Sequence, residues 1–251
     1  MTPDETTSNS IAPVRNVAAL CELVDRVQSR SYGLPGMATF YGKSGFGKTF
    51  ASTYAAVQFG AIHVEVRSTW SQKKFCQTVL REIGGPQKSR SIADMVEEIT
   101  EALARTDRPL LVDEADHLVR RRMIEIVRDI ADGSQAPVVL IGEELLPEKL
   151  QAWERIHGRM LDFVRAEPAS ARDLDHMARI YAPGIEIAAD LKRAMHAASR
   201  GSLRRISVNL AAAEQMAKRQ GLTAVDMATW AGRDFWTGDT PALGGNVRRI
   251  A

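Results

Sequence analysis

The sequence predicts an α/β protein in which a three-layer domain with a parallel sheet precedes a small, all-helical domain. Short apolar runs of strand character alternate with longer stretches of helical periodicity over residues 37–164. Strands that alternate with helices form a parallel sheet covered on both faces. After Pro168 the strand signals cease and only helical segments follow. At 251 residues, the chain is long enough for one large and one small domain.

The elements follow in a regular order. Apolar residues at helical spacing from Val17 to Val27 predict a first helix over residues 14–30, which ends before a turn rich in Gly and Pro. The predicted strands are 37–41, 61–66, 110–113, 137–142 and 161–164. The helices between them are 48–59, 71–83, 91–105, 115–132 and 144–157. The second domain is predicted to contain helices 170–181, 187–199, 203–219 and 223–232.

These signals divide the chain into four segments. A polar N-terminal tail, 1–13, precedes the α/β domain, 14–166. The helical domain, 167–236, follows, and a tail without periodicity, 237–251, is expected to be flexible.

Charge, cysteine content and apolar runs restrict the classes of partner and site that the protein can have. With 33 Lys and Arg against 31 Asp and Glu, the formal net charge is only +2, so a nucleic acid would have to bind a local patch. Cys21 and Cys76 form no C-x-x-C pair, which argues against a disulfide framework or a zinc site. No apolar run approaches the roughly 20 residues that span a bilayer, and the N-terminus does not resemble a signal peptide. We therefore expect a cytoplasmic protein without a membrane partner.

Residues 42–49 read G-K-S-G-F-G-K-T and match the phosphate-binding pattern G-x-x-x-x-G-K-[ST], directly after a predicted strand and at the start of a helix. In such a loop, backbone N–H groups and the helix N-terminus surround the phosphates. Lys48 is expected to reach the β- and γ-phosphates, and Thr49 to offer its hydroxyl to Mg²⁺. ATP and Mg²⁺ are the expected cofactors. The remaining loop residues are Gly42, Lys43, Ser44, Gly45, Phe46 and Gly47.

The third predicted strand, 110–113, is apolar and ends in the carboxylate Asp113, which Glu114 follows. Asp113 is predicted to hold the Mg²⁺ shell and Glu114 to polarise the attacking water. An alternative is that both residues simply cap the helix that follows.

With these two motifs the chain resembles the AAA+ superfamily, which implies ATPase activity (ATP and water to ADP and phosphate). Members of that superfamily usually have Asn, Thr or Ser after the fourth strand as a sensor of the γ-phosphate. Here the strand runs into Gly142-Glu143-Glu144. Because a carboxylate repels a phosphate, Glu143 is expected to pair with a cation or to point away.

The same resemblance implies roles for arginines. Arg155 and Arg159 precede the fifth strand, where an AAA+ arginine reaches the nucleotide of a neighbouring subunit, and Arg159 lies nearer that strand. In the lid, Gly201-Ser202-Leu203-Arg204 resembles the second sensor, with Arg205 as the second choice. The alternative for Arg155 and Arg159 is a solvated basic helix end, and the alternative for the lid arginine is a surface position.

Over residues 14–232, the Gly-x-x-Arg-Arg lid helix and the run L-V-D-E-A-D-H-L resemble the transposition regulators of the Mu transposition protein B and Tn7-type group. That resemblance implies an ATP-dependent oligomer on duplex DNA, largely independent of base sequence, which delivers target DNA to a transposase.

Basic residues after the second strand suggest where such DNA would bind. Arg67, Lys73, Lys74 and Arg81 are suited to phosphate contacts, and Lys74 and Arg81 would share a helix face. The alternative is a solvated helix face. A second cluster, 120–122, falls in a predicted helix, where consecutive residues diverge by about 100°.

Two other functions remain open from the sequence. One is an adaptor similar to a helicase loader, acting mainly on a protein partner. The other is a nucleotide-dependent switch that hydrolyses ATP slowly.

Overall fold

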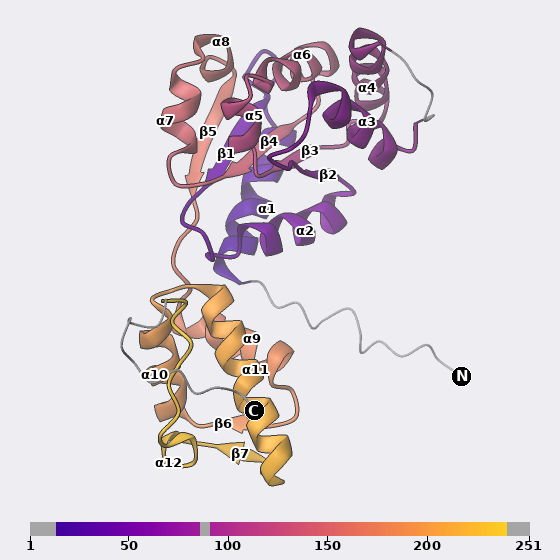
Figure 1. The fold of residues 1–251 in the computed structure, drawn as a ribbon. Coiled ribbons are helices and arrows are strands. Elements are labelled where there is room, and N and C mark those ends of the chain that lie inside the picture. The colour runs from indigo at the N-terminus through magenta and orange to yellow at the C-terminus, as the bar shows by residue number, and fades with distance from the viewer. Residues whose placement is uncertain (1–13, 86–90, 240–251) are drawn as a thin grey trace, which may run out of the picture. The chain divides into compact units, whose positions relative to one another are not determined.

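A computed structural model describes residues 14–85 and 91–239 of the chain (Figure 1). The chain divides into two compact units, one ending at Glu167 and the next beginning at Pro168. The predicted tail 1–13 lies outside the described residues, as does all but the first part of the predicted tail 237–251.

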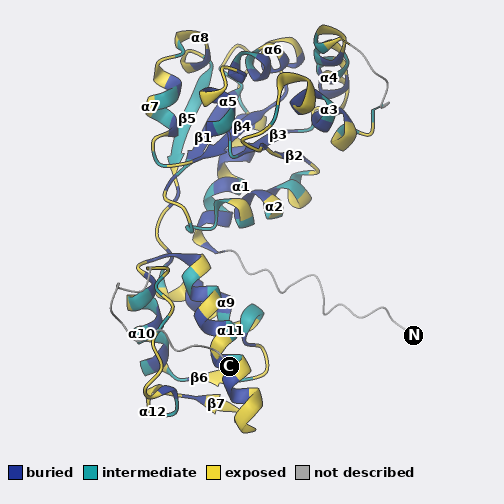
Figure 2. Ribbon diagram, in the orientation of Figure 1, coloured by how far each residue is buried: buried dark blue, intermediate teal, exposed yellow. Residues whose placement is uncertain are grey.

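The first unit is built on a five-stranded sheet with the order β2-β3-β4-β1-β5. Its strands are β1 Met37–Tyr41, β2 Ile62–Glu65, β3 Leu110–Asp113, β4 Val138–Gly142 and β5 Met160–Arg165. Every neighbouring pair is parallel. The central strands are apolar because helices cover both of their faces, and Figure 2 shows them buried. The predicted parallel sheet is confirmed.

Helices complete the three layers. They are α1 Arg15–Gln28, α2 Lys48–Phe59, α3 Gln72–Ile83, α4 Ile92–Thr106, α5 Asp116–Arg120, α6 Ile124–Ser134, α7 Leu146–Gln151 and α8 Glu154–His157. Helices α1 and α2 pack together on one face of the sheet, and α3, α4 and α6 form the layer on the other (Figure 1). The amphipathic helices bury their apolar stripes in the core of this unit.

Two predicted helices are each divided in the structure. The predicted helix 115–132 breaks between α5 and α6, where Arg122 takes the left-handed φ of 55° and the Met123 N–H bonds the Leu118 carbonyl at 2.8 Å. The predicted helix 144–157 breaks at Trp153, whose ψ of 78° is not helical. Arg121 and Arg122 therefore lie outside a helix, and the divergence expected for consecutive helical residues does not apply to them.

The second unit contains four helices in its described part, α9 Ala171–Tyr181, α10 Ala189–Ser199, α11 Leu203–Gln220 and α12 Met227–Trp230. It is not entirely helical, because β6 Glu186–Ile187 and β7 Ala224–Val225 form a small parallel sheet. Strands of two residues are too short to show a period of two in the sequence. The β7 strand also takes the start of the predicted helix 223–232, which leaves only α12.

Candidate functional site

One edge of the sheet brings the predicted motifs together. In a parallel sheet the carboxyl ends of the strands meet at one edge, where α/β proteins bind ligands. The glycine-rich loop follows β1, the carboxylate pair follows β3, and Glu143 follows β4. Backbone hydrogen bonds join the three: Gly42 donates to the Gly142 carbonyl at 3.3 Å, and Ala115 donates to the Ile141 carbonyl at 2.9 Å.

The loop has the backbone of a phosphate cradle. Gly45 and Gly47 take left-handed φ values of 86° and 84°, which favour glycine. Gly47 caps α2 without a side chain, so the first N–H groups of that helix are left for an anion. An added Cβ at Gly42 would lie 3.0 Å from the Ala166 Cβ, so the loop also needs glycine there for packing.

The Lys48 ammonium lies across the mouth of this loop. Its Nζ donates to the carbonyls of Gly42 at 2.7 Å and Lys43 at 3.1 Å. Burial lowers the pKa of Lys48, while the negative charges of Glu114 and Asp113 act to raise it. A phosphate brought to this ammonium would add further negative charge and stabilise its protonated form.

Asp113 lies at the bottom of the site. It is 1% exposed, and its Oδ2 accepts a hydrogen bond from the Ser52 hydroxyl at 3.4 Å. The single Ser52 hydroxyl proton is shared with the backbone carbonyl of Thr49 at 2.9 Å, so Ser52 links the Thr49 turn of α2 to the end of β3. Hydroxyl and carboxylate oxygens are the ligands that Mg²⁺ prefers, so Thr49 and Asp113 fit this ion.

Glu114 adopts a left-handed backbone with φ of 55°. Residues other than glycine in this region are held there by their surroundings and cluster at active sites. Burial and the neighbouring Asp113 charge raise the pKa of Glu114, and Lys48 opposes that rise. Neither carboxylate caps α5, whose N-cap residue is Ala115 without a side-chain cap, so the structure contradicts the capping alternative.

The groups at this edge fit Mg²⁺ and ATP. The loop N–H groups and Lys48 would hold the phosphates, and Thr49 and Asp113 would hold the ion. When bound, the ion neutralises charge that develops on the phosphates. Glu114 projects from the strand end beside these groups and could accept a proton from water.

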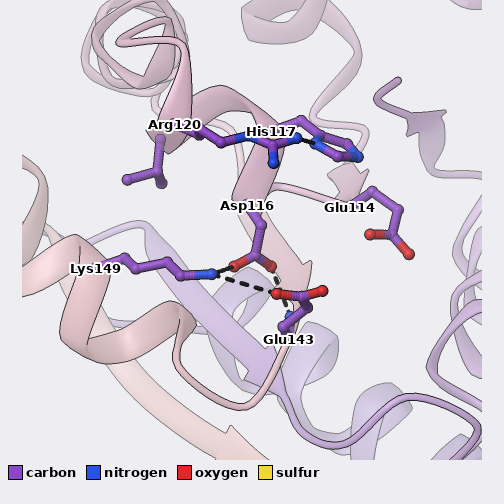
Figure 3. A pocket seen from close by; sticks show the side chains of 7 residues that line it. Glu114, Asp116, His117, Arg120, Glu143 and Lys149 are labelled. Carbon is purple, nitrogen blue, oxygen red and sulfur yellow. Dashed lines mark hydrogen bonds and ion pairs between the residues drawn. The ribbon is translucent and has the colours of Figure 1, made fainter. Parts of the chain in front are cut away.

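Glu143 pairs with a cation, which is one of the two arrangements expected from the sequence. Lys149, on α7, places its Nζ 2.5 Å from Asp116 Oδ1 and 3.3 Å from Glu143 Oε2 (Figure 3). Asp116 Oδ2 also accepts the Glu143 N–H at 2.6 Å. These residues line a cavity of about 310 Å³ together with Glu114. Asp116 thereby ties the segment that carries Glu114 to the segment that carries Glu143.

Asp116 and Lys149 were not among the residues predicted from the sequence. A signal for the first is Gly142: a Cβ there would lie 2.2 Å from Asp116 Oδ2, so only glycine lets the carboxylate approach β4. A signal for the second is a lysine six positions after Glu143, within reach across the start of a helix.

The comparisons with known proteins agree with this geometry. Residues 32–150 match the family model described as an AAA domain. The Orc1 protein of Aeropyrum pernix, solved in complex with DNA, superposes with a TM-score of 0.62 at 20% identity, over 88% of this chain and 65% of that one. Cdc6p from Pyrobaculum aerophilum gives 0.60 at 16% identity, over 89% and 66%.

The chain has the AAA+ fold. It spans slightly less than two thirds of the length of these two proteins. A search of curated protein sequences finds no significant match. Among the described residues, no helix combines the length and apolar character needed to cross a bilayer.

Arg155 and Arg159 lie at the opposite edge of the AAA+ sheet from the loop. The Arg159 carbonyl accepts the N–H of Met37, the first residue of β1, and β1 rises about 13 Å before the loop begins. Neither guanidinium can therefore reach the nucleotide site of its own sheet. Arg159 donates through Nε to Asp132 at 2.5 Å, whereas Arg155 is exposed on α8.

Arg204 and Arg205 lie in the first turn of α11, in the second unit. Arg204 is exposed, and Arg205 packs near Gly238. Ser202 caps this helix by accepting the Arg205 N–H at 3.3 Å. The sensor role of Arg204 stays a prediction.

The basic residues predicted to contact DNA lie on and before α3. Lys73, Lys74 and Arg81 are exposed, and the opposite face of α3 is buried in the core. Arg67 is exposed in the preceding loop, at the nucleotide edge, because Val66 donates to the Asp113 carbonyl at 2.9 Å. The Arg81 guanidinium bonds Glu82 at 3.1 Å, which offsets part of its charge.

We predict that Asp116→Ala lowers the free energy of unfolding by about 1–3 kcal/mol, because it leaves the Glu143 N–H without its acceptor and Lys149 with Glu143 alone. The matched control is Asp175→Ala, which removes an ion pair between the exposed Asp175 and the partly exposed Lys192. That control should change the same free energy by about 0.2–1 kcal/mol. Urea unfolding of both variants measures the difference, and equal losses would contradict the role given to Asp116.

Proposed function

We propose that this protein is a Mg²⁺-dependent ATPase whose nucleotide site is the carboxyl edge of the five-stranded sheet. One observation carries the proposal: Lys48, Asp113 and Glu114, from two strand ends, meet at one edge, where the charges of Asp113 and Glu114 act to raise the pKa of Lys48. A loop that matched the pattern by chance would not have a carboxylate pair at the same edge.

In the proposed reaction the protein contributes positioning and proton transfer. The loop N–H groups and Lys48 bind and orient the phosphates. Glu114 orients the attacking water and accepts its proton, which requires the ionised carboxylate. Arg204, as a lid sensor, is proposed to add a positive charge to the same nucleotide.

Lys48→Ala should weaken binding of Mg·ATP by roughly 100-fold, about 3 kcal/mol, because the phosphates lose a charged donor. Calorimetric titration measures this. The control Lys218→Ala changes an exposed lysine of α11, outside the loop, and should leave binding unchanged. A Lys48→Ala variant that binds Mg·ATP like the parent would remove the basis of the proposal.

Glu114→Gln should retain ATP and lower turnover by about 10²–10⁴-fold, since a proton acceptor is lost. Glu148→Gln, a change to an exposed carboxylate on α7, should leave turnover unchanged. In the parent, turnover should fall as the pH drops through the Glu114 pKa, which lies above the usual 4.5 because burial and Asp113 raise it. Phosphate release measured against pH tests both statements. Parent-like turnover by Glu114→Gln would reassign the base.

We further propose that the chain self-associates so that Arg159, or else Arg155, reaches the nucleotide of another copy. Support comes from their position at the edge remote from their own site. The same edge exposes Tyr32 completely and half of Leu34, and Leu34 lines a cavity of about 290 Å³ with Arg159. Large exposed apolar side chains of this kind favour a protein contact.

A mixing experiment tests this. Arg159→Ala should lower turnover by roughly 10³-fold, as loss of an arginine supplied in trans does. Adding Lys48→Ala subunits, which keep Arg159 but lack a working site, should restore part of the turnover. Arg155→Ala, treated in the same way, shows which arginine acts. No recovery in either mixture would exclude action between subunits.

DNA is the proposed polymer partner. The Orc1 protein that this chain resembles was solved with DNA, and Arg67, Lys73 and Lys74 present exposed cations on the nucleotide side of the AAA+ unit. Cations that contact phosphates bind duplex DNA with little preference for base sequence.

Lys73→Ala combined with Lys74→Ala should weaken duplex binding for all sequences and reduce the slope of log K against log salt by about 1.8, at about 0.9 per phosphate contact. Lys218→Ala combined with Arg219→Ala removes the same charge from the exposed end of α11 and is the control. Fluorescence anisotropy at several salt concentrations gives the slopes. Equal effects of the two pairs would indicate a general charge effect instead.

The sequence resemblance to transposition regulators leads us to propose that the DNA-bound oligomer presents its DNA to a transposase. An adaptor that acts on a protein partner is the second candidate. A slow switch is a third, favoured by Glu143, an acid where AAA+ proteins usually place a neutral polar sensor. Electron microscopy with ATP and duplex DNA separates the first from the others, because only the first requires a filament that encloses DNA.

A further inference from the structure

Asn16, in the first turn of α1, is a buried amide with a full set of partners. It is 2% exposed. Its Nδ2 donates to the carbonyl of Phe46 at 2.8 Å and to the carbonyl of Glu167 at 2.8 Å, and its Oδ1 accepts the Glu167 N–H at 2.9 Å. The Asn16 side chain therefore binds the N–H and the carbonyl of Glu167 and also the carbonyl of Phe46.

The two residues that Asn16 joins belong to separate parts of the first unit. Phe46 lies in the loop that is proposed to hold the phosphates. Glu167 is the last residue before the second unit begins at Pro168. We define residues 165–167 as the exit segment.

The exit segment touches the loop at a second place. Ala166 donates its N–H to the Tyr41 carbonyl at 2.7 Å, immediately before the loop starts. Gly42 packs closely on Ala166, because an added Cβ would also lie 3.1 Å from the Ala166 carbonyl oxygen. The loop is thus held against the exit segment at its beginning by packing and near its middle by Asn16.

A movement of the loop backbone must therefore act on the exit segment. Buried amide groups that lose their partners are costly, so Asn16 favours arrangements in which Phe46 and Glu167 keep their separation. Phosphates drawn to the loop N–H groups would shift or stiffen the peptide units that include the Phe46 carbonyl.

We propose that Asn16 is a positioning residue that transmits occupation of the nucleotide loop to the exit segment, and so to the start of the second unit. The proposal rests on the proposed function, because it requires that the loop bind a nucleotide. In this proposal, α1 couples the loop to the exit segment in addition to packing on the sheet.

The second unit offers a matched control. Asn209 is 1% exposed and binds a distant residue in the same way: its Nδ2 donates to the Trp236 carbonyl at 3.1 Å, and its Oδ1 accepts the Trp236 N–H at 2.8 Å. None of these contacts involves the nucleotide loop. Its substitution has the same chemistry and the same kind of structural cost.

The test is hydrogen exchange of the full chain with and without saturating Mg·ADP, followed in peptides that cover residues 42–49 and 164–170. In the parent, ADP should slow exchange in both. Asn16→Asp keeps the acceptor for Glu167 but loses both donors. In this variant, ADP should still slow exchange in 42–49. The factor by which ADP slows exchange in 164–170 should be roughly tenfold smaller than in the parent, as expected from the loss of one or two such hydrogen bonds. Asn209→Asp should respond like the parent.

Each other outcome decides between the two proposals. If ADP slows neither peptide in the parent, the proposed function fails. If it slows 42–49 but not 164–170 in the parent, or if Asn16→Asp responds fully in both, the inference is overturned and the function stands. Should Asn16→Asp not fold, Asn16→Ser, which keeps a neutral hydroxyl but cannot span both partners, replaces it with the same expectations.

Discussion

The common direction of β1, β3 and β4 is the constraint on which the site depends. Because the three strands run parallel, the loop after β1, the carboxylates after β3 and Glu143 after β4 all emerge at one edge. Helices on both faces hold the strands in this order, so residues that lie far apart in the sequence, such as Lys48 and Asp113, meet at this edge. Reversing one strand would place its polar end about a strand length away.

Electrostatics explains why this edge attracts a ligand. Lys48 is partly buried among the carboxylates of Asp113, Glu114, Asp116 and Glu143, and burial still lowers its pKa. An edge that holds four acids and one partly buried lysine favours divalent cations, and the uncapped start of α2 favours anions. A metal ion bound together with a phosphate satisfies both tendencies. The Lys149 ammonium neutralises the acids on the side away from the loop.

The sequence predicted the sheet, its helices and the loop because each depends on local patterns. Apolar runs, periodicity and the spacing of glycines are visible in a short stretch of chain. It did not predict the break at Arg122 or the strands β6 and β7, since a left-handed residue and a two-residue strand leave no period. Asp116, Lys149 and Asn16 were also missed. Their roles come from partners between 27 and 151 positions away, and a single sequence does not show such pairings.

In the proposed assembly, the ion pair between Arg159 and Asp132 would set a small threshold. The Arg159 guanidinium would have to leave this exposed carboxylate before it could meet phosphates on another molecule. In an isolated copy, Arg159 would stay paired with Asp132. When copies bind side by side on one polymer, Arg159 could exchange that partner for the phosphates of a neighbour. Turnover would then rise more steeply than in proportion to the protein concentration. Dispersed copies would hydrolyse little ATP, and assembled copies would hydrolyse it faster.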